Sequence, residues 1–146
     1  MIWRRSYDVP PPAVSTDSEY YPGNDRRYAD IPKNLLPTTE SLKTTAERFL
    51  PYWKNEIFPR VLKGERLVIS AHGNSLRALM FLDQISEKDI TGLNIPTACP
   101  LVYDFDEQGN VIPHPDAIAP LRGHYLGDQE VIRAKINKVA NQTKKN

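Results

Sequence analysis

The segment that most constrains the fold is a short apolar run that leads through a turn into a helical pattern. Residues 66–71 read Arg-Leu-Val-Ile-Ser-Ala, which is typical of a strand buried on both faces of a parallel sheet. The turn His72-Gly73-Asn74 follows, and Ser75 can cap a helix whose apolar residues keep helical spacing. The order strand, turn, helix predicts an α/β fold with residues 66–71 as a central strand.

Further patterns extend this unit in both directions. Capping residues at Thr38-Thr39-Glu40 predict a helix that ends near Gly64, and Pro51 and Pro59 predict a kink or a division into two helices. The remaining predictions are a short helix over 86–93, a second strand over 101–106 and a last helix over 127–141.

Strands separated by helices normally pair in parallel through crossovers, so we expect a mainly parallel sheet. Two or three strands make a thin sheet, and the pattern therefore indicates an incomplete fold that lacks N-terminal strands. We expect one domain over residues 1–146, in which a polar, proline-rich segment at 1–37 is loop-rich and residues 38–146 form the α/β part.

The composition excludes several classes of protein. Nineteen basic and 18 acidic side chains nearly cancel, which argues against a nucleic-acid partner. The sequence holds no apolar run near the roughly 20 residues that cross a membrane and no signal segment, so we expect a soluble, cytoplasmic protein without a membrane partner. Cys99 and the three histidines lack metal-ligand spacing, and no metal site is expected.

Two groups of residues could carry chemistry. His72 would lie at the carboxyl end of a strand, where α/β proteins bind ligands, and Gly73 would let the backbone approach an anion near the free amides of the next helix. Arg4 and Arg5 could bind a phosphate or carboxylate through paired guanidinium groups. Each has a plainer alternative, because His72 could simply bond a neighbouring carbonyl and adjacent arginines are often solvated.

Taken together, the motifs resemble a known family. Five blocks in order are similar to the 2,3-bisphosphoglycerate-dependent phosphoglycerate mutases of the histidine phosphatase superfamily, and the likeness continues through residues 100–103 and 125–130, so that it covers nearly the whole chain. The five blocks are Trp-Arg-Arg-Ser-Tyr-Asp-Val-Pro-Pro-Pro at 3–12, Asp-Arg-Arg-Tyr-Ala-Asp at 25–30, Glu-Ser-Leu-Lys at 40–43, Ala-His-Gly-Asn-Ser-Leu-Arg-Ala-Leu at 71–79 and Gly-Leu-Asn-Ile-Pro-Thr at 92–97.

The resemblance implies a three-layer phosphoglycerate mutase-like fold and the interconversion of 3-phosphoglycerate and 2-phosphoglycerate through a phosphohistidine in glycolysis and gluconeogenesis. It implies priming by 2,3-bisphosphoglycerate without a metal. By motif position, His72 matches the second active-site histidine, Gly73 and Asn74 fall in the same phosphate pocket, and Arg4 and Arg5 match the pair that holds the phosphoglycerate. Whether the chain forms a homo-oligomer stays open.

The sequence departs from the family at two places. It contains neither the Arg-His-Gly of the nucleophilic histidine nor the general acid/base glutamate, which predicts a fragment that is inactive alone. The connection at 107–124 is longer than is usual in the family, with residues 113–120 as extra material ahead of the C-terminal segment, which in the family helps to close the site. The alternatives are a phosphatase of the same superfamily and a non-catalytic phosphate-binding or regulatory domain.

Overall fold

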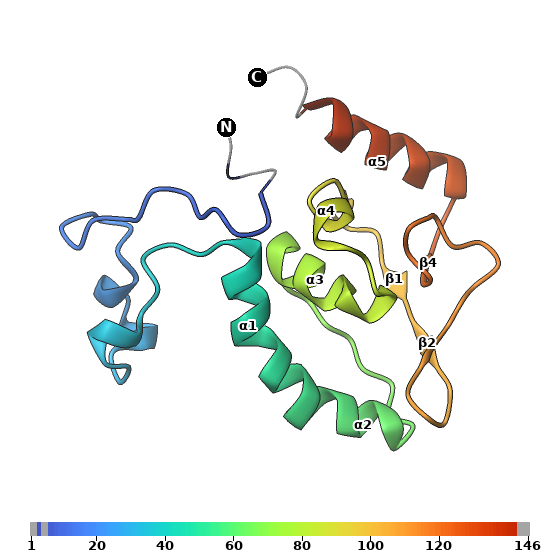
Figure 1. Cartoon of the computed structure of the whole chain (residues 1–146), viewed down its shortest axis with the longest axis horizontal. Helices are drawn as coiled ribbons and strands as arrows, with labels where there is room; N and C mark the ends of the chain where they lie inside the picture. The colour runs from blue at the N-terminus through green and yellow to red at the C-terminus, as the bar shows by residue number, and fades with distance from the viewer. Residues whose placement is uncertain (1–2, 4–5, 143–146) are drawn as a thin grey trace.

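The computed structural model describes residue 3 and residues 6–142, with side chains as far as residue 138, and it is a mixed fold of helices and short strands (Figure 1). The α-helices are α1 (Leu42–Tyr52), α2 (Phe58–Leu62), α3 (Gly73–Leu79), α4 (Glu87–Ile90) and α5 (Gln129–Gln142). The strands are β1 (Leu101–Val102), β2 (Asp104–Phe105), β3 (Val111–Ile112) and β4 (His124–Tyr125).

The predicted division of the first long helix is confirmed. A π-helical segment, η5 (Trp53–Ile57), joins α1 to α2, with Pro51 inside α1 and Pro59 in the first turn of α2. A proline has no amide to donate, so the regular hydrogen-bond ladder cannot run through this stretch. The helix begins later than the cap predicted at residues 38–40, because Ser41 caps it: its Oγ accepts from the Thr44 amide at 3.2 Å, and its own amide donates to Thr44 Oγ1 at 2.9 Å.

The core lies where α1 packs against α3, which the 3-10 segment η6 (Met80–Asp83) continues. Ala46 on α1 and Ala78 on α3 are buried, and such small side chains let two helices approach closely. At the end of α1, the Trp53 ring lies 5.7 Å from the Phe58 ring and 6.4 Å from the Phe105 ring, measured between centroids. These aromatic contacts connect the helices to the strands.

The strands form two small antiparallel sheets, which differs from the parallel pairing that we predicted. In one sheet, Leu101 lies opposite Tyr125, and in the other, Phe105 lies opposite Val111. The predicted strand at 101–106 is therefore divided between two sheets. Its partner β3 lies in the connection at 107–124, and β4 begins at the last residue of that connection. A turn at residues 107–110, with Gly109 at φ 81°, joins β2 to β3.

The prediction of a central strand at residues 66–71 is wrong in this structure. The segment runs from α2 to α3 without strand pairing, turn or bend. Val68 is 96% exposed. The physical reason is that no other strand of the described residues lies beside it, so that the apolar run has nothing to pair with.

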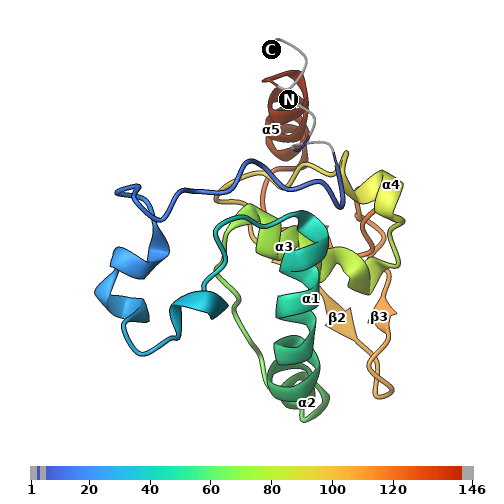
Figure 2. The ribbon, with the colours of Figure 1, turned by 60° about the vertical axis from the view of Figure 1, so that its left-hand side comes forward.

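The segment ahead of α1 is built from 3-10 turns, namely η2 (Pro22–Asn24), η3 (Arg26–Tyr28) and η4 (Lys33–Leu35). Its two ends are joined, because the Val14 amide donates to the Thr38 carbonyl at 2.9 Å and Thr39 Oγ1 donates to the Pro11 carbonyl at 2.6 Å. Figure 2 shows this segment projecting from the side of α1 that is opposite to β2 and β3.

Helix α5 covers another part of the molecule and buries Ile132 in the core. Its bounds agree with the helix predicted at 127–141 to within two residues at its start. Among the residues that the structure describes, no helix has the length and apolar character that a membrane crossing would require.

Candidate functional site

His72 begins helix α3 and acts as its N-cap. Its Nδ1 accepts a hydrogen bond from the Asn74 amide at 3.2 Å, whereas we had predicted Ser75 as the cap. The capping residue therefore lies three positions earlier than predicted. The imidazole of His72 can take this role because its unprotonated nitrogen accepts from a free amide of the first turn, as a serine hydroxyl would.

This cap fixes which ring nitrogen of His72 is available to a ligand. A neutral imidazole that accepts through Nδ1 carries its proton on Nε2. The His72 side chain is exposed, so that Nε2–H is a hydrogen-bond donor directed away from the helix backbone. Such a donor can bind a phosphoryl or carboxylate oxygen. The cap at Nδ1 is the one side-chain hydrogen bond that the described residues give to His72.

Asn74 and Gly73 stand beside this donor. Asn74 Oδ1 accepts from an Arg77 guanidinium nitrogen, so that the amide group is held by a cation one turn further along α3. A Cβ placed on Gly73 would meet nothing within 4 Å. Packing therefore does not require glycine at this position, and the space above it is open to a ligand.

The arginine pair predicted to hold substrate, Arg4 and Arg5, lies outside the described residues. Tyr7, from the same sequence block, is placed. Its ring meets the Phe81 ring edge-on at 6.0 Å, and its carbonyl accepts from the Lys43 amide at 2.9 Å. Burial, followed by the charges of two nearby glutamates, raises the pKa of Tyr7. Tyr7 therefore lies between η6 and the start of α1.

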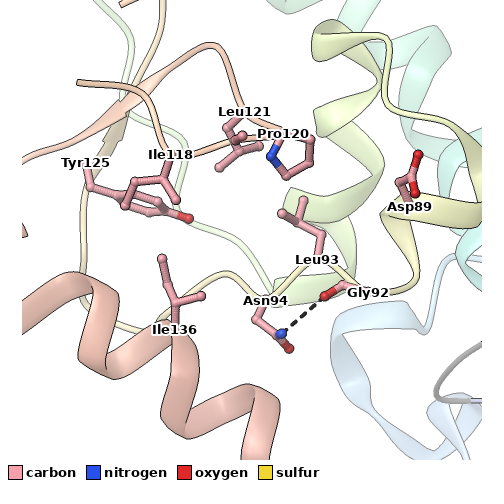
Figure 3. Close-up of a pocket in the computed structure, with 10 residues that line it drawn as sticks. Asp89, Gly92, Leu93, Asn94, Ile118, Pro120, Leu121, Tyr125 and Ile136 are labelled. Atoms are coloured by element: carbon pink, nitrogen blue, oxygen red, sulfur yellow. Dashed lines mark hydrogen bonds between the residues drawn. The ribbon is translucent and has the colours of Figure 1, made fainter. Parts of the chain in front are cut away.

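A cavity of about 490 Å³ lies elsewhere, between α5, the loop at residues 117–121 and the turn after α4 (Figure 3). Its lining is mostly apolar, and His72, Gly73 and Asn74 are not part of it. Figure 3 shows the Tyr125 hydroxyl directed into it, and the Asn94 side-chain amide donating to the Gly92 carbonyl at 3.1 Å. With neither a nucleophile beside a base nor a cationic lining residue, this cavity offers little to a phosphate ester.

A buried polar cluster that the sequence did not indicate joins Asp83 of η6 to Tyr103, between β1 and β2, and to Arg122, ahead of β4. Asp83 accepts from the Tyr103 hydroxyl and, at 2.8 Å, from the Arg122 amide. The Arg122 guanidinium lies 3.7 Å from the same carboxylate. Burial and the bond to Asp83 raise the pKa of Tyr103 well above its ordinary value. Asp83, Tyr103 and Arg122 hold one another through these contacts, which indicates a structural anchor.

Two histidines that the sequence gave no reason to connect are stacked. The rings of His114 and His124 lie 3.7 Å apart at 21°. His114 Nδ1 accepts from the Asp116 amide at 3.1 Å, which repeats the local geometry of His72. Stacked rings direct their in-plane lone pairs along parallel lines, so they do not converge on one metal ion. Among the described residues, no cluster of three or more histidine, cysteine or acidic side chains has a metal-binding arrangement.

No protein-family model matches the chain.

Proposed function

We propose that this chain contributes the second-histidine part of a 2,3-bisphosphoglycerate-dependent phosphoglycerate mutase site. In this proposal His72 donates to the phosphoryl group that is transferred, Gly73 and Asn74 line the phosphate pocket, and Arg4 and Arg5 hold the phosphoglycerate. The five ordered sequence blocks support it. The proposal includes a phosphoglycerate mutase-like three-layer fold for the complete protein, with strands beyond those of this chain.

The observation that carries the proposal is the orientation of His72. Because Nδ1 is occupied by the cap, the ring presents an Nε2–H donor on an exposed side chain. Catalysis of phosphoryl transfer depends chiefly on positioning and on donors that stabilise charge. The hydrogen bond from the Asn74 amide positions the His72 ring, so no second side chain is needed to orient it.

The residues present also suit 2,3-bisphosphoglycerate in part. The Nε2–H donor of His72 and the guanidinium of Arg77, which is bonded to Asn74, offer the kind of donors that a phosphate accepts. When bound in such a site, this compound supplies the phosphoryl group that primes the enzyme. The chain's own residues would bind and orient it.

The chain has no Arg-His-Gly, since its one His-Gly is His72-Gly73 preceded by Ala71. A covalent phosphohistidine requires that nucleophile, so we expect the 146 residues to bind phosphoglycerate without turnover. The same observation favours a second candidate function, a non-catalytic phosphate-binding or regulatory domain.

The test is a titration of the chain with 3-phosphoglycerate in which calorimetry measures the binding. We expect binding that weakens about tenfold in His72→Asn, the equivalent of about 1.4 kcal/mol for one lost hydrogen bond to a charged group. Asparagine is a good N-cap, so this change removes Nε2–H while keeping the helix start.

His114→Asn is the matched control, because His114 makes the same bond to an amide two residues ahead and lies outside the proposed site. Equal affinity of both variants and the parent would contradict the role of His72. In a coupled mutase assay, we expect no turnover by the chain alone. Turnover restored by a separate polypeptide that carries Arg-His-Gly would favour the mutase over the regulatory domain.

A further inference from the structure

The cavity beside helix α5 is lined mainly by apolar side chains. They are Leu93 from the turn after α4, Ile118 and Leu121 from the loop at residues 117–121, and Ile136 from α5 (Figure 3). Its volume of about 490 Å³ lies within the range of roughly 300–1,000 Å³ that is typical of small-molecule sites. An apolar cavity of about 150 Å³ can hold benzene, so this cavity has room for a compound of about two rings.

One buried polar group is directed into this cavity. Tyr125 is 1% exposed, and Figure 3 shows its hydroxyl pointing into the space between the lining side chains. Within the described residues, that hydroxyl has no hydrogen-bond partner. The backbone of Tyr125 is held separately, through its pairing with Leu101 in the sheet of β1 and β4. Phenylalanine would pack in the same way without an unpaired polar atom, so the fold alone does not account for the hydroxyl.

The Tyr125 hydroxyl is a hydrogen-bond donor at neutral pH. Burial, and then the nearby Cys99, raises the pKa of Tyr125 to about 12, so the phenol keeps its proton. A ligand that reaches the hydroxyl therefore needs an acceptor atom. A hydrogen bond made in an apolar cavity is stronger than the same bond in water, because water does not compete for either partner.

The lining favours a neutral ligand. No described lysine or arginine lines the cavity, so an anion would lose its water without gaining an opposite charge. The one acidic lining residue, Asp89, is exposed, and its Oδ2 accepts from the Ser86 hydroxyl at 2.7 Å. A cation beside Asp89 would therefore stay in water, outside the apolar part of the cavity.

We propose that the cavity binds a neutral, mainly apolar molecule of about two rings, whose carbonyl oxygen accepts a hydrogen bond from the Tyr125 hydroxyl. This site is separate from the proposed phosphate site and does not rest on it, because His72, Gly73 and Asn74 do not line the cavity. Residues 66–71, whose strand partners would come from outside this chain, do not line it either.

Two compounds that differ by a carbonyl oxygen test the hydrogen bond. 1-Indanone and indane share a two-ring frame, and only 1-indanone has the acceptor. NMR titrations, followed at the methyl groups of Ile118 and Ile136, measure the affinity of each compound. Tyr125→Phe should weaken the binding of 1-indanone about tenfold and leave the binding of indane unchanged. The same ratio of parent to variant affinity for both compounds would overturn the proposal, because the hydroxyl would then make no bond to the carbonyl.

Filling the cavity tests where the compounds bind. Ile136→Trp places a larger side chain in the cavity and should abolish the binding of both compounds. Val131→Trp is the matched control on the same helix, because Val131 is 52% exposed and does not line the cavity. Unchanged far-ultraviolet circular dichroism establishes that both variants fold.

Three outcomes would contradict the assignment of this site. The first is a parent chain that binds neither compound at millimolar concentration, and the second is binding that survives Ile136→Trp. The third is loss of 1-indanone binding when an excess of a polypeptide that carries Arg-His-Gly is added, since protein from outside this chain would then occupy the cavity. Binding that persists in that mixture supports a small-molecule site in the complete protein.

Discussion

Residues 66–71 and 101–105 are both short apolar runs, yet only the second forms strands. Leu101–Val102 pairs with His124–Tyr125, and Asp104–Phe105 pairs with Val111–Ile112. The run at 66–71 makes no backbone hydrogen bond within the described residues. The two runs therefore differ in the strand partners that the chain provides.

The position of the partner explains the difference. A tight turn at residues 107–110 returns the chain directly to β2, and closing such a short loop costs little conformational entropy. A helix follows residues 66–71, so any strand beside them must come from farther away in the sequence or from another molecule. The lesson is that local pattern favours an extended backbone, whereas pairing depends on the rest of the fold.

The largest effect is expected from removing the polar anchor of the paired region. Asp83→Ala leaves the Tyr103 hydroxyl and the Arg122 amide without their shared acceptor, whose side chain is fully buried. We expect a loss of about 3 kcal/mol in the free energy of unfolding, measured by urea denaturation. Asp17→Ala, at an exposed carboxylate, should change it by less than about 0.5 kcal/mol. Equal losses would show that the Asp83 cluster is no anchor.

A pair of identical substitutions compares the two regions directly. Val111 is 6% exposed and Val68 is 96% exposed. Val111→Ala should cost about 2 kcal/mol of unfolding free energy, from lost burial and the cavity left behind. Val68→Ala should cost less than about 0.5 kcal/mol in dilute, monomeric protein. If Val68→Ala were the more costly change, residues 66–71 would have to be packed in solution.

A smaller effect is expected from the buried phenol of the paired region. Burial, and then the nearby Cys99, raises the pKa of Tyr125 to about 12. A group whose folded pKa is raised contributes stability that is present below its unfolded pKa of about 10 and is lost as the pH rises toward the folded value. The free energy of unfolding should therefore fall between about pH 10 and 12.

Tyr125→Phe should make this alkaline loss shallower. Within the part of the chain that the structure describes, the Tyr125 hydroxyl is buried without a hydrogen-bond partner, so at pH 7 its removal should change stability by no more than about 1 kcal/mol. Urea titrations at several pH values measure both quantities. An alkaline profile that is identical in the variant would contradict the assignment to Tyr125.

The helices followed from local signals. Pro51 and Pro59 predicted the interruption between α1 and α2, and Ser86 predicted the start of α4, where its Oγ accepts from the Asp89 amide at 3.2 Å. The strand pairing could not be predicted, because it depends on contacts between distant segments. Residues 113–120, interpreted as extra material, connect β3 to β4, and the His114 amide donates to the Arg122 carbonyl at their base, at 2.9 Å.

The candidate site was predictable only as a motif. The position of His72 before a helix was correct, whereas its capping bond to the Asn74 amide was not foreseen, since a histidine is an uncommon cap. Asp83 carries no sequence signal, because an isolated acid in an apolar context has no defined partner until the fold brings Tyr103 to it. The roles of Arg4, Arg5, Gly73 and Asn74 stay predictions from the resemblance.

The most direct test of the contrast between residues 66–71 and the paired strands is amide hydrogen exchange, measured by NMR at micromolar protein concentration. The amides of Val68 and Ile69 should exchange within about tenfold of the rate of an unstructured peptide. Those of His114 and Leu126, each bonded to a backbone carbonyl at 2.9 Å, should exchange at least about a hundredfold more slowly. Equal protection of Val68 and Leu126 in the monomer would contradict the account, because residues 66–71 would then have a strand partner within their own chain.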